Sequence, residues 1–392
     1  MAERTRIGLI FDYDESWIAG SYYLMNIIHA LNTLEDDVKP HITVFARSIE
    51  DFNKIKKETG YSYLSYYPYP IRPKYAFLER VINKISRTLL KKNLITKKVI
   101  PPYVQFVYPH QHPAFDIYGV KKVNWIPDFQ EAFMPHFFSE KDLMKRKKYQ
   151  EEVLCKGDWV VFSSNDAKSH YLQLYPYAKT KIFVLPFAVT HPDFSDQQIY
   201  DIRMKYNIPE KYFFAPNQFW QHKNHIVVLN ALKILKEKGK KDIVVVFSGK
   251  EYDYRNILYV QELKDFVKKN QLEENVYFLG FLPRKEQLCI MQNAIAVIQP
   301  SLFEGWSTVV EDAKALGKHI VLSDIPVHRE QTQEIQNHVS FFNSHDPYQL
   351  SMILETLKTD VPSSYHINYK KNINSFGRRF LELVEYSKSD VN

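Results

Sequence analysis

Short apolar runs alternate with longer segments in which apolar positions recur every three or four residues. In the first half, the short runs predict strands at 7–11, 42–45, 104–108, 123–126, 159–162 and 182–185. Helical spacing predicts helices at 22–34, 140–156 and 166–174. The stretch 61–73 is rich in Tyr and Pro and predicts a loop.

The pattern breaks around 186–193, where prolines and polar residues interrupt it, and then restarts. The second half predicts strands at 212–215, 243–248, 276–279, 296–299 and 320–322. It predicts helices at 225–238, 257–270, 285–293, 309–316 and 376–386. Regular alternation of this kind is typical of a parallel sheet covered by helices on both faces. The predicted fold class is therefore α/β with two Rossmann-like domains, at 1–190 and 191–372.

Length and charge agree with this division. The 392 residues are too many for one ordinary domain. A net charge of +7 favours anionic ligands, but no nucleic-acid recognition motif is visible, so nucleic acid is not predicted as a partner. The two cysteines, Cys155 and Cys289, lie far apart and predict neither a disulfide nor a metal site.

Membrane association is a separate question. The N-terminus lacks the apolar core of a signal peptide, and no run of about 18 apolar residues appears, so a cytoplasmic protein without a membrane span is predicted. The segment 74–98 has the spacing of a basic amphipathic helix. Two interpretations stay open for it, a solvated helix face and docking on an anionic membrane surface.

The most informative segment is 300–318. A buried strand ends at Gln299, a loop carries Glu304 and Gly305, and a helix follows. Ligands of open α/β sheets bind at the carboxyl ends of strands, and a helix start offers N–H groups to a diphosphate. Trp306, Ser307 and Thr308 lie between the acid and the helix and are predicted to bind the same ligand.

A second segment, 213–225, also runs from a strand to a helix start. It carries Lys223 directly before the predicted helix, with Gln218 and His222 earlier in the loop. A lone lysine at a helix start is ordinarily just solvated, so this residue by itself assigns no ligand.

Together these segments resemble the retaining glycosyltransferases of family 4, which have the GT-B fold. The family signature is a Glu, a Gly soon after, an acid eight residues on, then Ala and a later Gly. Glu304, Gly305, Asp312, Ala313 and Gly317 match it, although the family usually has Glu where Asp312 stands.

Two neighbouring acids compete for the ribose hydroxyls of the donor. Glu311 is one residue too early for the signature, and Thr308 with Glu311 has the spacing of a capping box. We therefore favour Asp312 for the ribose and a structural role for Glu311, with Glu311 as the alternative.

The resemblance implies further roles. Two parallel sheets would face each other across a cleft, and a helix at 373–392 would cross back to the first domain. Lys223 would hold the donor phosphates. The loop lacks the Arg that often helps to hold the phosphates, and Gln218 and His222 stand near its usual place.

The remaining donor-side candidates are Gly249, Phe281 and Leu282, and the acceptor-side candidates are Gly20 and Asp128. His110 is a catalytic candidate facing the donor sugar, or a plain loop histidine; no third ligand joins His110 and His112, so no metal is predicted.

The implied function is retaining, metal-independent transfer from a nucleotide-diphosphate sugar to a glycan or lipid-linked acceptor, in surface polysaccharide synthesis. Glu304, Lys223 and His110 would be catalytic, and no cofactor is expected. The protein would be cytoplasmic, and peripheral at the inner face of a membrane if segment 74–98 docks there. Two alternatives remain: an epimerase or phosphorylase on the same fold, and a degenerate non-catalytic protein that binds sugar nucleotides.

Overall fold

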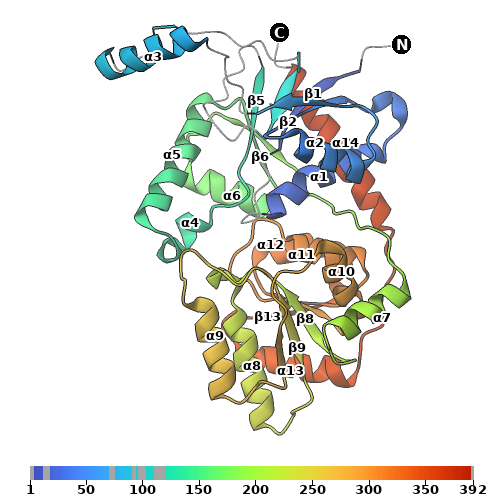
Figure 1. The fold of residues 1–392 in the computed structure, drawn as a ribbon. Coiled ribbons are helices and arrows are strands. Elements are labelled where there is room, and N and C mark those ends of the chain that lie inside the picture. The colour runs from blue at the N-terminus through green and yellow to red at the C-terminus, as the bar shows by residue number, and fades with distance from the viewer. Residues whose placement is uncertain are drawn as a thin grey trace. The chain divides into compact units, whose positions relative to one another are not determined.

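The computed structural model describes residues 4–11, 18–69, 76–90, 94–95, 103–109 and 120–389. The first sheet has seven strands in the order β3-β2-β1-β4-β5-β6-β7, and every described pair from β3 to β6 is parallel. These strands are β1 (Arg6–Phe11), β2 (His41–Ala46), β3 (Leu64–Pro68), β4 (Phe106–Tyr108), β5 (Lys121–Trp125), β6 (Trp159–Phe162) and β7 (Lys181–Val184). Strands β1, β2, β5 and β6 are labelled in Figure 1.

The second sheet has six parallel strands in the order β10-β9-β8-β11-β12-β13. They are β8 (Phe213–Pro216), β9 (Val245–Ser248), β10 (Val276–Phe278), β11 (Val297–Gln299), β12 (Ile320–Ser323) and β13 (Val339–Phe342). The prediction of an α/β fold with two parallel Rossmann-like sheets is confirmed.

Helices connect the strands. In the first half they are α1 (Ile18–Asn32), η2 (Asp36–Val38), α2 (Ile49–Thr59), α3 (Phe77–Leu90), α4 (Gln130–Phe133), η3 (Pro135–Phe137), α5 (Glu140–Lys156) and α6 (Asn165–Leu174). In the second half they are α7 (Asp196–Lys205), η4 (Gln221–Lys223), α8 (His225–Glu237), α9 (Tyr259–Lys269), α10 (Arg284–Asn293), α11 (Thr308–Ala315), α12 (Pro326–Gln331), η5 (Gln333–His338), α13 (Pro347–Thr359) and α14 (Tyr369–Ser389). None of the described helices is long and apolar enough to cross a membrane.

The second sheet is buried on both faces. Phe213, Ala215 and Val245 belong to one apolar cluster, whereas their neighbours Phe214 and Val246 belong to another. Because successive side chains of a strand point to opposite faces, the two clusters are the two layers between the sheet and its helices. This explains why these strands appear in the sequence as continuous apolar runs.

Each sheet follows the same rule of order. Counted within its own sheet, the strands run 3-2-1-4-5-6-7 in the first sheet and 3-2-1-4-5-6 in the second. The chain therefore reverses direction across the sheet between β1 and β4 in the first and between β8 and β11 in the second. Loops at such a switch point diverge and leave the crevice in which α/β proteins bind ligands.

Three local predictions were wrong. Residues 64–68 form strand β3 rather than a loop, and α3 covers only the middle of the predicted helix 74–98. Helix α1 begins at Ile18, so Gly20 lies in its first turn rather than in a loop.

Contacts group the chain into two compact units. One contains residues 1–125, 152–161 and 377–392, and the other contains residues 126–151 and 162–376. Within the first unit, Arg378 of α14 pairs with Glu35, and Phe380 packs on Phe106. The boundaries predicted at 190 and 372 stay predictions.

Candidate active site

The candidate site lies at the switch point of the second sheet, where the loops after β8 and β11 meet. The β8 loop forms η4, after which Asn224 takes a left-handed conformation (φ 55°) and α8 begins. The Leu302 N–H donates to the His222 carbonyl at 2.8 Å. The Asn224 amide donates to the Pro300 carbonyl at 3.2 Å. These bonds fix the two loops against each other.

The loops bring together the two residues with the strongest sequence signal. The Lys223 ammonium donates to the Glu304 carboxylate at 2.5 Å, and Gln299 donates to the same oxygen at 2.7 Å. The side chains of Lys223 and Glu304 are only 15% and 10% exposed. Burial alone would raise the pKa of Glu304, but the charge and hydrogen bond of Lys223 outweigh it and lower that pKa. Glu304 is therefore an ionised carboxylate at neutral pH.

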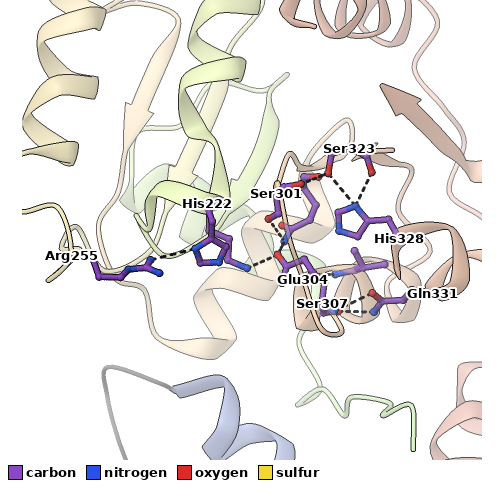
Figure 2. A network of polar contacts seen from close by, with 11 residues as sticks. His222, Arg255, Ser301, Glu304, Ser307, Ser323, His328 and Gln331 are labelled. Carbon is purple, nitrogen blue, oxygen red and sulfur yellow. Dashed lines mark hydrogen bonds and ion pairs between the residues drawn. The ribbon is translucent and has the colours of Figure 1, made fainter. Parts of the chain in front are cut away.

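A buried histidine lies near Glu304. Figure 2 shows His328 beside Ser323 and near Glu304. His328 Nδ1 lies 2.8 Å from the Ser323 carbonyl, which fixes its proton on Nδ1. Burial lowers the pKa of His328 although Glu304 opposes the shift, so the imidazole is neutral. Its buried Nε2 makes no hydrogen bond to the described residues.

The structure also supplies an arginine that the sequence analysis missed. Arg255 comes from the loop after β9, pairs with the buried Asp253 at 2.9 Å and reaches His222 Nδ1 at 3.3 Å (Figure 2). Burial, with Lys223 and Arg255 nearby, holds the pKa of His222 well below its usual range. His222 is therefore a neutral acceptor for Arg255, and the positive charge here comes from Lys223 and Arg255. The sequence signal was an acid and an arginine two residues apart in a loop that follows a buried strand.

The start of α11 differs from the predicted capping box, which is wrong. Ser307, not Thr308, caps the helix, and its hydroxyl accepts from the Val310 N–H at 3.4 Å. Gln331 bonds both the N–H and the carbonyl of Ser307, at 3.1 and 2.7 Å (Figure 2). The first N–H groups of the helix, on Thr308 and Val309, have no acceptor within it and remain suited to an anion.

Both acids that compete for the ribose are buried. Glu311 accepts from Lys314 at 3.1 Å, from Gln331 at 3.0 Å and from Tyr369 at 2.5 Å. Glu311 is thus enclosed by donors other than Thr308, and its structural role stays a prediction.

Asp312 is held differently. Two nitrogens of Arg284 bond its carboxylate, and His191 lies 2.9 Å away. Burial would raise the pKa of Asp312, but Arg284 outweighs it and the pKa is lowered. The side chains of Arg284 and His191 are 18% and 13% exposed, against 6% for Lys314 beside Glu311. Asp312 is thus the acid whose partners reach solvent, and its ribose contact stays a prediction.

The predicted donor-side loops also meet one another. Gly249 has φ 148° and donates to the Gly280 carbonyl at 2.8 Å, which joins the β9 loop to the segment before Phe281. Phe281 is 57% exposed, whereas Leu282 is buried in the core. The buried Gln218 Oε1 has no partner among the described residues.

Two residues of the Glu304 loop have partners inside the protein. A Cβ on Gly305 would lie 2.0 Å from the Pro127 carbonyl oxygen and 3.1 Å from the Asp128 Cβ. Glycine is required there by this backbone, and the same approach places Asp128 beside the loop. The Trp306 indole donates to the Phe187 carbonyl at 3.0 Å.

The remaining predictions concern His110 and metals. His110 lies outside the described residues. Among the residues that are described, no group of three His, Cys, Asp or Glu side chains could hold a metal ion.

The two parallel Rossmann-like sheets, together with the solved structures that share them, place the chain in the GT-B type of α/β fold. Residues 199–374 match the family model described as Glycosyl transferases group 1. The alpha-1,3/1,6-mannosyltransferase ALG2 of Dictyostelium discoideum is 25% identical over 240 residues, covering 53% of this chain and 56% of the relative. The O-antigen chain mannosyltransferase RfbU of Salmonella typhimurium is 24% identical over 205 residues, covering 52% of each.

The chain thus spans about half the length of the curated relatives it matches. Among solved structures, Anabaena HepE in complex with UDP and glucose superposes with a TM-score of 0.64 at 16% identity, covering 97% of this chain and 100% of HepE. That likeness shows the fold, and the family model and the relatives support a glycosyltransferase.

Proposed function

We propose that the chain is a retaining, metal-independent glycosyltransferase of family 4. It transfers a sugar from a nucleotide-diphosphate donor to a glycan or lipid-linked acceptor, in surface polysaccharide synthesis at the inner face of a membrane. The observation that carries this proposal is the buried Lys223–Glu304 pair, 2.5 Å apart at the switch point between β8 and β11. The two mannosyltransferase relatives support the class of reaction, and the UDP in HepE supports a nucleotide donor.

The chemistry follows from the charges. Lys223, with Arg255 behind His222, faces the donor diphosphate, and the first N–H groups of α11 face it from the other loop. As the bond from the anomeric carbon to the phosphate oxygen breaks, these groups stabilise the negative charge on the leaving diphosphate. The acceptor oxygen bonds to the same face of the anomeric carbon and passes its proton to the leaving phosphate. The ionised Glu304 accepts hydrogen bonds from hydroxyls of the donor sugar and orients them.

Nucleotide binding tests the donor site directly. Thermal unfolding is measured with UDP, GDP, ADP, CMP and TDP, with magnesium and with EDTA. A nucleotide at about 100 times its Kd stabilises by roughly 2.7 kcal/mol. We expect one nucleotide class to raise the Tm equally in magnesium and EDTA, and Lys223→Ala to abolish the rise. Lys240→Ala, which removes an exposed lysine of the same unit, is the control and should keep it.

Product analysis separates the proposed transfer from its alternatives. With the stabilising nucleotide-sugar and an acceptor, NMR of the product should show the anomeric configuration of the donor. Conversion of the donor without any acceptor would identify an epimerase, and a requirement for inorganic phosphate would identify a phosphorylase. Nucleotide binding without turnover, unchanged by Glu304→Gln, would identify a non-catalytic binding protein.

A further inference from the structure

Helix α3, which is labelled in Figure 1, exposes a row of apolar side chains. Its large apolar side chains recur at helical spacing and are mostly open to solvent: Phe77 72%, Leu78 72%, Val81 38%, Ile82 42% and Ile85 54% exposed. Residues at this spacing share one side of a helix. Contiguous exposed apolar surface of this kind marks an interaction site in a soluble protein.

Two uncharged polar side chains of the same helix are covered instead. Asn83 is 4% exposed and exchanges two hydrogen bonds with the backbone of Ile95, at 2.8 and 2.9 Å. Ser86 is 2% exposed and accepts from the Leu94 N–H at 3.3 Å. A surface helix ordinarily buries its apolar side and exposes its polar side. Helix α3 instead leaves its apolar side chains exposed and buries Asn83 and Ser86, so a solvated charged face alone does not account for its surface.

Positive charge borders the apolar face. Arg80, Lys84 and Arg87 are exposed and follow one another at helical spacing. The single acid of α3, Glu79, accepts from the Ala76 N–H at 2.6 Å and caps the helix start. An apolar stripe with a basic stripe beside it is typical of a helix that lies in the interface of an anionic bilayer.

We propose that α3 docks the protein on an anionic phospholipid bilayer, with the apolar face in the acyl boundary and the three basic side chains at the headgroups. With 14 residues the helix lies along the surface rather than across it. The docking rests on exposure and charge alone. Its consequence, delivery of the donor site to a lipid-linked acceptor, rests on the proposed function.

Vesicle flotation with the full chain tests the docking. Phosphatidylcholine vesicles with and without 30% phosphatidylglycerol are used at two salt concentrations. We expect flotation with the anionic vesicles, weaker flotation with the neutral ones, and a decrease at high salt. Ile82→Ser with Ile85→Ser should reduce partitioning roughly tenfold or more. Arg80→Glu with Lys84→Glu should remove the preference for anionic lipid.

Matched controls keep the result interpretable. Leu172→Ser with Met204→Ser replaces apolar side chains that are 45% and 54% exposed on α6 and α7, and it should float as the unchanged protein does. Unchanged Tm values would show that each variant folds.

Two results would overturn the proposal. One is a wild-type chain that stays at the bottom of the gradient with anionic vesicles; the other is a serine variant of α3 that floats like the wild type. Light scattering tests whether a second copy of the chain covers the face instead. That would be the conclusion if the wild type is a dimer, the α3 serine variant is a monomer, and neither of them floats. The nucleotide-induced rise in Tm is measured separately. If the chain floats but no nucleotide raises its Tm, the proposed function alone is refuted. If a nucleotide raises the Tm but the chain does not float, the docking alone is refuted.

Discussion

Replacing Lys223 with alanine removes the cation that neutralises Glu304. The carboxylate would stay among buried groups, with Gln299 as a neutral donor at 2.7 Å. Removing one partner of a buried ion pair typically costs about 3–5 kcal/mol, because the remaining charge is left uncompensated. For a domain of this size, about 2–4 °C of Tm corresponds to 1 kcal/mol, so we expect a loss of about 10 °C at neutral pH.

The pH dependence gives the sharper test. In the native chain the pKa of Glu304 is lowered, so the pair stabilises above the unfolded pKa of about 4.3, and this contribution is lost as the pH falls through the folded pKa. Without Lys223, burial dominates and raises the pKa of Glu304. The variant then favours a protonated carboxyl and loses stability as the pH rises from about 4.3 through the raised pKa.

Chemical denaturation at pH 5 and pH 7.5 measures both effects. The difference between native chain and Lys223→Ala should be large at pH 7.5 and smaller at pH 5. Lys240→Ala removes one partner of an exposed pair with Glu355 and should change little at either pH. A Lys223→Ala chain within about 1 kcal/mol of the native one at pH 7.5, or a loss independent of pH, would refute a buried charged pair.

Three further changes test the fold around the site. Gly249→Ala should prevent stable folding, because its Cβ would lie 2.1 Å from the Asn217 carbonyl oxygen at φ 148°, and soluble yield checks this. Gly239→Ala, with φ 80° and nothing within 4 Å, is the matched control and should cost only about 1–2 kcal/mol by denaturation. Tyr369→Phe removes a hydroxyl that donates to the buried Glu311 at 2.5 Å and should cost about 1–3 kcal/mol by urea denaturation; no change would contradict this. Asp312→Asn should cost about 1–3 kcal/mol at neutral pH. Because the pKa of Asp312 is lowered in the folded chain, the loss should persist down to about pH 4 and shrink as the pH falls further through that lowered pKa; a loss that acid leaves unchanged would contradict the charge argument.

The alternation of strands and helices was readable because apolar periodicity reports burial directly. The helix predicted at 140–156 is found as Glu140–Lys156, and the one predicted at 309–316 as Thr308–Ala315. Strand β3 was missed because its Tyr- and Pro-rich sequence resembles a loop. It lies at the edge of its sheet and ends at Pro68, where a missing N–H costs little.

The site was predictable where the loop after a central strand carries a residue that matches the family pattern. Lys223 and Glu304 are 81 positions apart, yet each stands in a loop at the end of a central strand. Arg255 lies as far beyond the end of β9 as Lys223 lies beyond the end of β8, but no signature residue marked it, and only tertiary packing brings it to His222. The predicted cap of α11 was one residue too late, because Ser307 and Thr308 are both good caps and the sequence does not choose between them.

A double substitution can show whether the Lys223–Glu304 pair serves ligand binding or the stability of the fold. A buried ion pair seldom adds net stability, since neutral groups of similar volume often replace it without loss. Lys223→Met combined with Glu304→Gln removes both charges and should therefore recover most of the stability that Lys223→Ala loses. If this double variant folds like the native chain but no longer gains stability from any nucleotide, then the pair serves the ligand rather than the fold. If it keeps the nucleotide response, the donor phosphates are held elsewhere and the assignment of Lys223 fails.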